Sequence, residues 1–234
     1  MPAYYKPRND LARVAFLRQA ARTAQLDAAA GDAYLSQSLI DQADAAAQAL
    51  SAAQLTADSC LSQRSREVEQ RNEALQKLAY YVRDFWEVAR RRMRRLEQPD
   101  AVLTFYGLHL DGATPNPSRA EEWLLIAAHV VQGESQAVAA GYPPMSNPSA
   151  AELTAVLETA QTAVSRVTTA DRAYDQAQEA LAAQRAQADR LIAEMMTELR
   201  FALRRHDAPS QRRILRNYGA TFTDDARPQA TPQI

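Results

Sequence analysis

The chain has 234 residues, of which 48 are alanine, 25 arginine, 2 lysine and 6 glycine, and its formal net charge is −1. A hydrophobic content of 47% with 24% charged residues excludes wholesale disorder, and the scarcity of aromatic residues and glycines argues against a β-sandwich or a Rossmann-type enzyme. The single cysteine excludes an intrachain disulfide, and the near-neutral charge removes the simplest case for a DNA-coating protein.

The first ten residues are polar and contain Tyr4 and Tyr5 ahead of Lys6. We interpret this segment either as an arm that docks on a neighbouring subunit or as a disordered arm. It has no apolar signal region, and the longest nearly uncharged apolar run, 123–131, is too short to cross a bilayer. The default expectation is a cytoplasmic protein, with export by a route without a cleaved signal as the alternative.

Glycine and proline are confined to a few places. Neither occurs between Asp32 and Gln98 or between Ser149 and Ala208, and both stretches are filled with strong helix formers. This distribution predicts an all-α fold.

In chain order we expect a first helix over 9–30, a loop around Gly31, a long helical stretch over 34–97 and a short helix from Pro99 that Gly107 stops. The same series then repeats. A helix over 118–132 is followed by a loop at Gly133–Pro148, a long stretch over 149–206 and a short helix from Pro209 that Gly219 stops.

A shift of about 110 residues superposes the two series and predicts a tandem duplication. Phe16-Leu17 falls on Trp123-Leu124, Ala30-Gly31 on Ala140-Gly141, and Tyr106-Gly107 on Tyr218-Gly219. The predicted organisation is a first repeat at 1–110, a second repeat at 111–219 and a flexible tail at 220–234.

Both long stretches carry an apolar or small residue at alternating spacings of three and four. In the second stretch the stripe runs from Leu153 to Met195 over thirteen positions, of which only Gln184 is polar. The first stretch carries a rougher stripe from Leu39 to Ala89, interrupted by Arg64 and Arg71. This period favours a seam between two paired helices.

Each stretch is either one helix or a hairpin broken near Thr56–Asp58 or Thr168–Asp171, and the unbroken stripe favours one helix. Large apolar residues gather where each stretch finishes, so we expect an antiparallel coiled coil with short helices clustered at each end. A compact bundle of six to eight helices is the alternative.

No pattern in the sequence indicates catalysis or a cofactor. The histidines at 109, 129 and 206 are dispersed without metal-ligand spacing, Cys60 lies in the apolar stripe, and no phosphate-cradling glycine loop occurs. We therefore expect a protein that is not an enzyme and holds no metal or cofactor.

Two arginine clusters end the long stretches at matching places. Three interpretations are open: the arginines complement the helix C-termini, contact acidic patches on another subunit, or bind nucleic acid or an anionic membrane surface. The near-zero net charge of the chain argues against the third interpretation. The candidate assembly or partner contacts are Tyr4, Tyr5, Arg90, Arg91, Arg94, Arg95, Arg204, Arg205, Arg212 and Arg213.

The segment Asn147-Pro148-Ser149-Ala150-Ala151-Glu152-Leu153 opens an alanine-rich helix that ends in Arg204-Arg205 before a proline and a short helix. This second-copy stretch of about 75 residues resembles a loose set of uncharacterised bacterial alanine-rich helical proteins. The resemblance implies an all-α architecture and no activity, cofactor or catalytic residue.

An alanine-lined pair of helices buries little apolar area for its length. The leading hypothesis is therefore a structural protein that self-associates into a filament, a lattice or a closed homo-oligomer. The alternative is a helical binding module that engages a partner protein, or nucleic acid through the arginine clusters.

Overall fold

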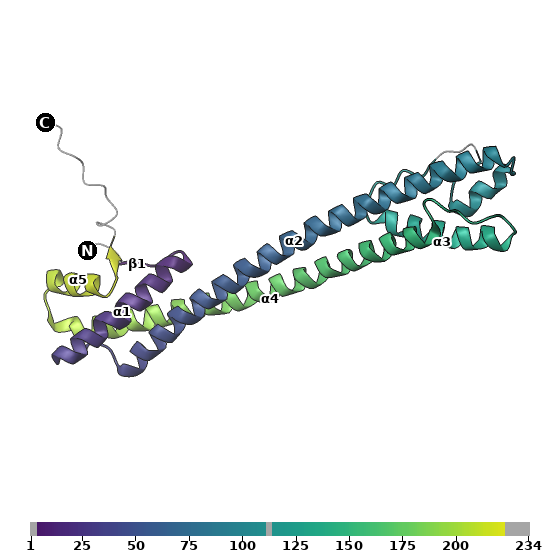
Figure 1. The fold of residues 1–234 in the computed structure, drawn as a ribbon. Helices are drawn as coiled ribbons and strands as arrows, with labels where there is room; N and C mark the ends of the chain where they lie inside the picture. Colours follow the sequence, from purple (N-terminus) through teal and green to yellow (C-terminus); the bar gives the residue numbers. More distant parts are fainter. Residues whose placement is uncertain (1–3, 111–113, 223–234) are drawn as a thin grey trace, which may run out of the picture. The chain divides into compact units, whose positions relative to one another are not determined.

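The computed structural model describes residues 4–110 and 114–222. It confirms the all-α prediction, because helices make up nearly all of the regular structure in these ranges (Figure 1). The elements are β1 (Tyr4–Tyr5), α1 (Asp10–Ala30), α2 (Gln37–Arg95), the 3-10 helix η1 (Asp100–Tyr106), α3 (Glu122–Ala139), α4 (Ala150–Ala202), the 3-10 helix η2 (Leu203–Arg205), α5 (Ala208–Asn217) and β2 (Thr221–Phe222).

Contacts within the chain group it into two compact units, each with its own apolar core. Unit 1 is Met1–Cys60 with Tyr174–Ile234, of which residues 4–60 and 174–222 are described. Unit 2 is Leu61–Ala173. Each unit combines segments of both predicted repeats, so the boundaries of the units are not those of the repeats. The tandem repeat stays a prediction.

The two long stretches are continuous helices, α2 and α4. Thr56, Thr168 and Thr169 lie inside them, and each hydroxyl donates to the carbonyl four residues earlier, at 3.0, 3.5 and 3.2 Å respectively. This intrahelical bond satisfies the hydroxyl without a break in the chain. The threonines are therefore not the caps of new helices that a hairpin would need.

The predicted stripes are the inward faces of α2 and α4. No position of the α4 stripe from Leu153 to Met195 is exposed. In the α2 stripe Arg64 is the exposed member, and its guanidinium pairs with the carboxylate of Asp171 on α4. Both cores contain residues from both helices.

Four segments end on one backbone pattern. A glycine with positive φ follows the helix, and the N–H of the next residue donates to the carbonyl five residues earlier. Glycine adopts a positive φ easily because it has no Cβ. These glycines and bonds are Gly31 (Asp32 to Asp27, 2.9 Å), Gly107 (Leu108 to Leu103, 3.2 Å), Gly141 (Tyr142 to Ala137, 3.1 Å) and Gly219 (Ala220 to Leu215, 3.0 Å).

The expected loop at Gly133–Pro148 is wrong in its first part. Helix α3 continues through Gly133 to Ala139, and the chain turns only at Gly141. A Cβ at Gly133 would lie 1.8 Å from the carbonyl oxygen of Phe105, so the glycine permits η1 to approach the helix closely. Here glycine marks close packing of two backbones and not a turn.

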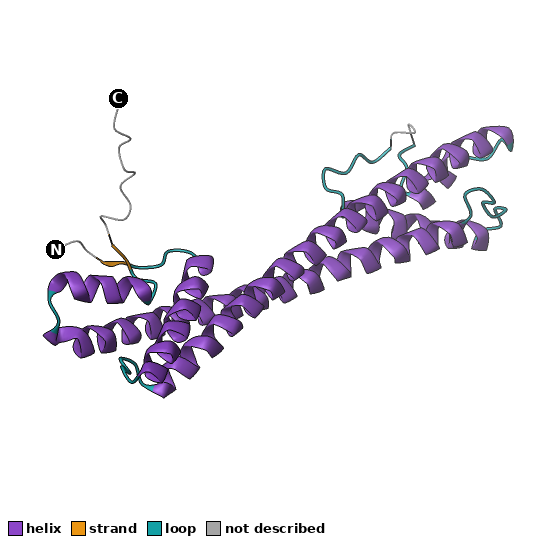
Figure 2. Cartoon of the chain, turned by 60° about the vertical axis from the view of Figure 1, so that its left-hand side comes forward, coloured by secondary structure: helices purple, strands orange, loops and turns teal. Residues whose placement is uncertain are grey.

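The N-terminal strand pairs with the C-terminal one. Tyr4 lies opposite Phe222 and Tyr5 opposite Thr221 in an antiparallel ladder, drawn in orange in Figure 2. Residues 220–222 belong to the segment predicted as a flexible tail, and Ala220 and Phe222 are buried in the core of unit 1. The rest of that segment, 223–234, lies outside the described residues.

Candidate ligand site at the N-terminal arm

The N-terminal arm, residues 4–9, is fixed at both ends within unit 1. Its first residues form β1, and its last residue, Asn9, caps α1 by accepting a hydrogen bond from the N–H of Ala12 at 2.8 Å. Lys6, Pro7 and Arg8 span the distance between strand and helix. Arg8 stacks on the ring of Tyr5 with its guanidinium carbon 4.5 Å from the ring centroid.

Two ion pairs join the start of α1 to α4. Arg13 donates to both carboxylate oxygens of Asp189, from Nε at 2.8 Å and from Nη2 at 3.0 Å. Asp10 in turn accepts two bonds from Nε of Arg185, at 2.9 and 3.0 Å, and one from its Nη2 at 2.6 Å. Each carboxylate thus faces a guanidinium in a bidentate arrangement, which gives directional strength.

These pairs shift the ionisation of the groups involved. The hydrogen bond from Arg185 lowers the pKa of Asp10 below its usual range, and the charge of Arg13 adds to this effect. The hydrogen bond to Asp189 raises the pKa of Arg13. The carboxylate of Asp10 therefore stays ionised at neutral pH. Both oxygens of Asp189 are already engaged by Arg13.

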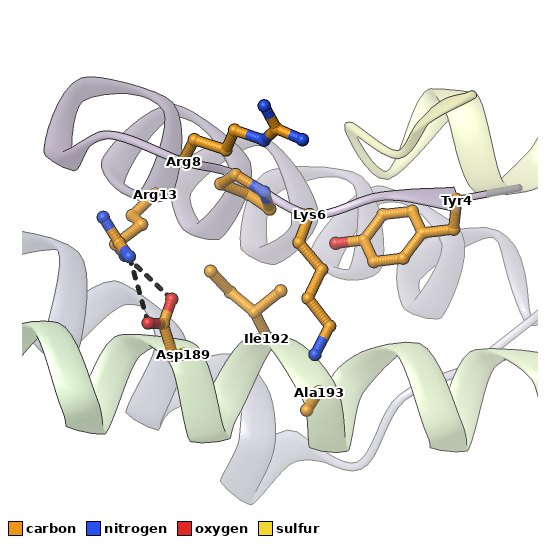
Figure 3. A pocket seen from close by; sticks show the side chains of 8 residues that line it. Tyr4, Lys6, Arg8, Arg13, Asp189, Ile192 and Ala193 are labelled. Atoms are coloured by element: carbon orange, nitrogen blue, oxygen red, sulfur yellow. Dashed lines mark hydrogen bonds and ion pairs between the residues drawn. The ribbon is translucent and has the colours of Figure 1, made fainter. Parts of the chain in front are cut away.

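A cavity of about 500 Å³ lies between the arm and α4. Figure 3 shows Ile192 and Ala193 of α4 on one side, Lys6 and Arg8 from the arm, and the Arg13–Asp189 pair at one end. The hydroxyl of Tyr4 points toward the middle of this space. That hydroxyl is buried and has no hydrogen-bond partner among the described residues.

Burial raises the pKa of Tyr4 to about 12, and the charge of Asp189 also raises it while that of Arg200 lowers it. The hydroxyl therefore keeps its proton at neutral pH and is available as a donor. Lys6 forms no ion pair with any described residue, so its ammonium is a second available donor at the same cavity.

Tyr4 also lines a smaller cavity of about 260 Å³. Arg200 from α4 and Arg212 from α5 line it together with Leu215 and Phe222. The guanidinium carbon of Arg200 lies 5.8 Å from the centroid of the Tyr4 ring. Both sides of this tyrosine are thus flanked by positive charge.

The ten predicted contact residues divide between the units. Tyr4, Tyr5, Arg204, Arg205, Arg212 and Arg213 belong to unit 1, and Arg90, Arg91, Arg94 and Arg95 belong to unit 2. Two of them, Tyr4 and Arg212, line one cavity together. Tyr5 lines a further cavity beside the arm, of about 510 Å³.

Local contacts occupy several of the arginines. Arg204 stacks on Phe201 with its guanidinium carbon 3.9 Å from the ring centroid, and it donates to the Phe201 carbonyl at 2.9 Å. Arg91 pairs with Glu87 one turn earlier at 3.5 Å. Arg90 is different, because its Nε and Nη2 are buried and have no hydrogen-bond partner in the part of the chain that the structure describes. The side chains at 94, 95, 205 and 213 are exposed.

Sequence reasoning missed two buried tyrosine–carboxylate pairs. The hydroxyl of Tyr106 donates to Glu134 at 2.8 Å in unit 2, and that of Tyr218 donates to Asp27 at 2.6 Å in unit 1. Burial first, and then the carboxylate, raises the pKa of both tyrosines above the ordinary 10.0. The sequence signal was the recurrence of Tyr-Gly at the end of each repeat.

Among the described residues, no three or more His, Cys, Asp or Glu side chains are grouped so that they could hold a metal ion. In the same ranges no helix combines the length and the apolar character that crossing a bilayer requires. No family model, curated protein or solved structure matches the chain, which agrees with a weak resemblance and no assigned functional family.

Proposed function

We propose that this chain is a non-enzymatic structural protein that self-associates through the outward side of α3. This surface, called the α3 face below, consists of Leu125, Ala128, Gln132, Ser135 and Ala139, with Val138 beside them. All six are exposed. Their spacing of three and four is that of a seam between paired helices, and the small residues allow another helix to approach closely.

The observation that carries the proposal is the absence of exposed formal charge on α3 after its first residue, Glu122. Between Trp123 and Ala139 the one formally charged side chain at neutral pH is Glu134, which is buried. The chain as a whole has 24% charged residues. Leu125 is nevertheless 76% exposed and Val138 43% exposed. An uncharged helix face with large exposed apolar side chains is typical of an interaction surface.

A second copy of the chain fits this surface. A twofold axis would place the α3 face against itself, and such pairing brings no like charges together because the face has none. Covering Leu125 on each copy would contribute about 1.5–3 kcal/mol per leucine. The occupant we propose is therefore the same face of another copy.

We also propose that the two halves are tandem copies. The support is that the two buried tyrosine–carboxylate pairs correspond. In each unit, the tyrosine before the closing glycine of one half binds a carboxylate on the first helix of the other half. The repeated pattern of helix ends at Gly31 and Gly141, and at Gly107 and Gly219, supports the same proposal.

The proposed arrangement of α2 and α4 is an antiparallel coiled coil. In unit 2, Arg64 of α2 pairs with Asp171 of α4. Ten residues later along α2, Ala74 shares a groove with the earlier α4 residues Glu158 and Thr162. The residue numbers of the α4 partners thus fall as the residue numbers along α2 rise. This supports the proposal that the two helices run in opposite directions.

The test is to place a charge in the α3 face. We expect the wild-type protein to form dimers or larger assemblies at about 100 μM, as measured by light scattering after size-exclusion chromatography. The variant Leu125→Glu should dissociate them, because pairing would then bury two carboxylates without partners. Negative-stain microscopy of the same samples would distinguish filaments from closed oligomers.

The matched control is Leu11→Glu on α1. Leu11 is 78% exposed and belongs to unit 1, so this variant adds the same charge at an equally exposed position outside the α3 face. We expect it to assemble as the wild type does. A monomer at every concentration, or assemblies that Leu125→Glu leaves intact, would contradict the proposal.

A further inference from the structure

We infer that the cavity between the N-terminal arm and α4 binds a small organic anion, with a carboxylate or phosphate group held by Lys6 and Tyr4 and a compact apolar group against Ile192. This site is independent of the α3 face, because every residue that lines it belongs to unit 1. Its volume of about 500 Å³ lies within the range of small-molecule sites, about 300–1,000 Å³.

The polar groups of the cavity determine the sign of the charge that a ligand should carry. Asp189 is the one carboxylate among the described residues that line the cavity, and both of its oxygens already accept bonds from Arg13. The groups left over are donors, namely the Lys6 ammonium and the buried Tyr4 hydroxyl. Donors without acceptors require a ligand that supplies acceptors, and an oxyanion does this best.

The surrounding charge agrees with an anionic ligand. The Asp10–Arg185 and Asp189–Arg13 pairs each sum to zero, so no other described residue that lines the cavity compensates the positive charges of Lys6 and Arg8. Arg200 adds a further positive charge on the other side of the Tyr4 ring. A negative group that enters between the arm and α4 is therefore attracted electrostatically.

The apolar part of the cavity determines the body of the ligand. Pro7 and Ile192 line the space beside the donors, and Figure 3 shows Ile192 between Lys6 and the Arg13–Asp189 pair. Ile192 is almost wholly buried and Pro7 is half-buried, so the apolar surface left for a ligand is small, and a compact ring or short aliphatic chain is enough to cover it. The chemical class is an aryl or alkyl carboxylate or phosphate.

An unsatisfied Tyr4 hydroxyl is itself informative. A buried hydroxyl without a protein partner adds no hydrogen bond to the stability of the folded protein. A ligand oxygen would supply the missing bond. The substitution Tyr4→Phe should therefore leave the thermal midpoint of the free protein unchanged or raise it, while it weakens ligand binding.

The chain contains only two lysines, Lys6 and Lys77, which permits a direct test. Reductive methylation with ¹³C-formaldehyde labels both amines and keeps their positive charge. The variants Lys6→Arg and Lys77→Arg assign the two signals. Benzoate and phenyl phosphate are the probes, and benzyl alcohol is the uncharged control.

We expect both anionic probes to shift the Lys6 signal with saturation at a dissociation constant of about 1 mM or tighter, while the Lys77 signal stays in place. Tyr4→Phe should weaken this binding about tenfold. A Lys6 signal that does not move, equal movement of both lysine signals, an equal response to benzyl alcohol, or unchanged affinity in Tyr4→Phe would each overturn the inference.

Discussion

Three tyrosines of this chain have buried hydroxyl groups that differ in their hydrogen bonding. Tyr106 and Tyr218 each donate to a carboxylate, whereas the buried hydroxyl of Tyr4 has no partner within residues 4–110 and 114–222. A satisfied buried hydroxyl stabilises the fold, and an unsatisfied one costs free energy. The same residue type is thus a structural contact in two places and a candidate ligand contact in the third.

Removing the Tyr106 hydroxyl should reduce stability clearly. Glu134 is only 3% exposed, and its second partner is the N–H of Met145. Tyr106→Phe leaves one oxygen of a buried carboxylate without a bond, which costs about 1–3 kcal/mol. Urea unfolding would measure this loss. Tyr80→Phe, at a tyrosine 69% exposed, is the control, and an equal effect in both variants would contradict the assignment.

The same tyrosines predict a loss of stability at alkaline pH. The pKa of Tyr4 is raised to about 12, and the pKa values of Tyr106 and Tyr218 are also raised above 10.0. Above pH 10 the unfolded chain loses these protons while the folded chain keeps them, so the free energy of unfolding falls as pH rises. The slope is at most about 1.4 kcal/mol per pH unit for each tyrosine.

Urea titrations between about pH 8 and pH 11 would follow this decline. The stabilising contribution is fully present below pH 10, where folded and unfolded tyrosines are both protonated. The variant that lacks both paired tyrosines, Tyr106→Phe with Tyr218→Phe, should show a shallower decline than the wild type. A stability that is flat or rises through pH 10 would contradict the prediction.

At the scale of elements, the packing of η1 on α3 depends on one glycine. Gly133→Ala would place a methyl group 1.8 Å from the Phe105 carbonyl oxygen, and backbone on both sides cannot move aside cheaply. We expect a loss of about 2 kcal/mol or more in the free energy of unfolding. Ser135→Ala, two residues later on the exposed side of α3, should change stability by about 0.5 kcal/mol or less.

The sequence predicts some helices better than others. The stripes of α2 and α4 were predictable because a period held over many turns specifies which face is inward. The extent of α3 was not, since glycine in a sequence can signal either a turn or a close approach, and only the position of Phe105 decides between them.

The candidate ligand site was still harder to predict. Tyr4 and Arg212 were both singled out, but as assembly contacts, and no local pattern indicates that the arm pairs with residues 221–222 and covers α4. Its cavity arises from segments separated by about 190 positions in the chain, such as Lys6 and Ile192. Pairings at such separation depend on tertiary contacts, for which one sequence carries no periodic signal.

At the scale of the whole chain, the two cores predict two separable unfolding transitions. Unit 1 and unit 2 each have a complete apolar cluster, and the seam positions of α2 nearest the division are small or polar, such as Ala57 and Arg64. The two clusters share no residue, so the loss of one core does not by itself remove the other. The coupling is open to measurement because both tryptophans, Trp86 and Trp123, lie in unit 2.

Tryptophan fluorescence consequently reports unit 2 alone, while far-ultraviolet circular dichroism reports the helices of both units. Leu199→Ala removes a fully buried side chain from the core of unit 1 and should cost about 2–5 kcal/mol. We expect it to shift the dichroism transition to lower urea and to leave the fluorescence transition in place. Leu153→Ala, equally buried in unit 2, should shift the fluorescence transition. Transitions that coincide for both probes in both variants would show instead that α2 and α4 transmit unfolding along their whole length, as a single cooperative protein does.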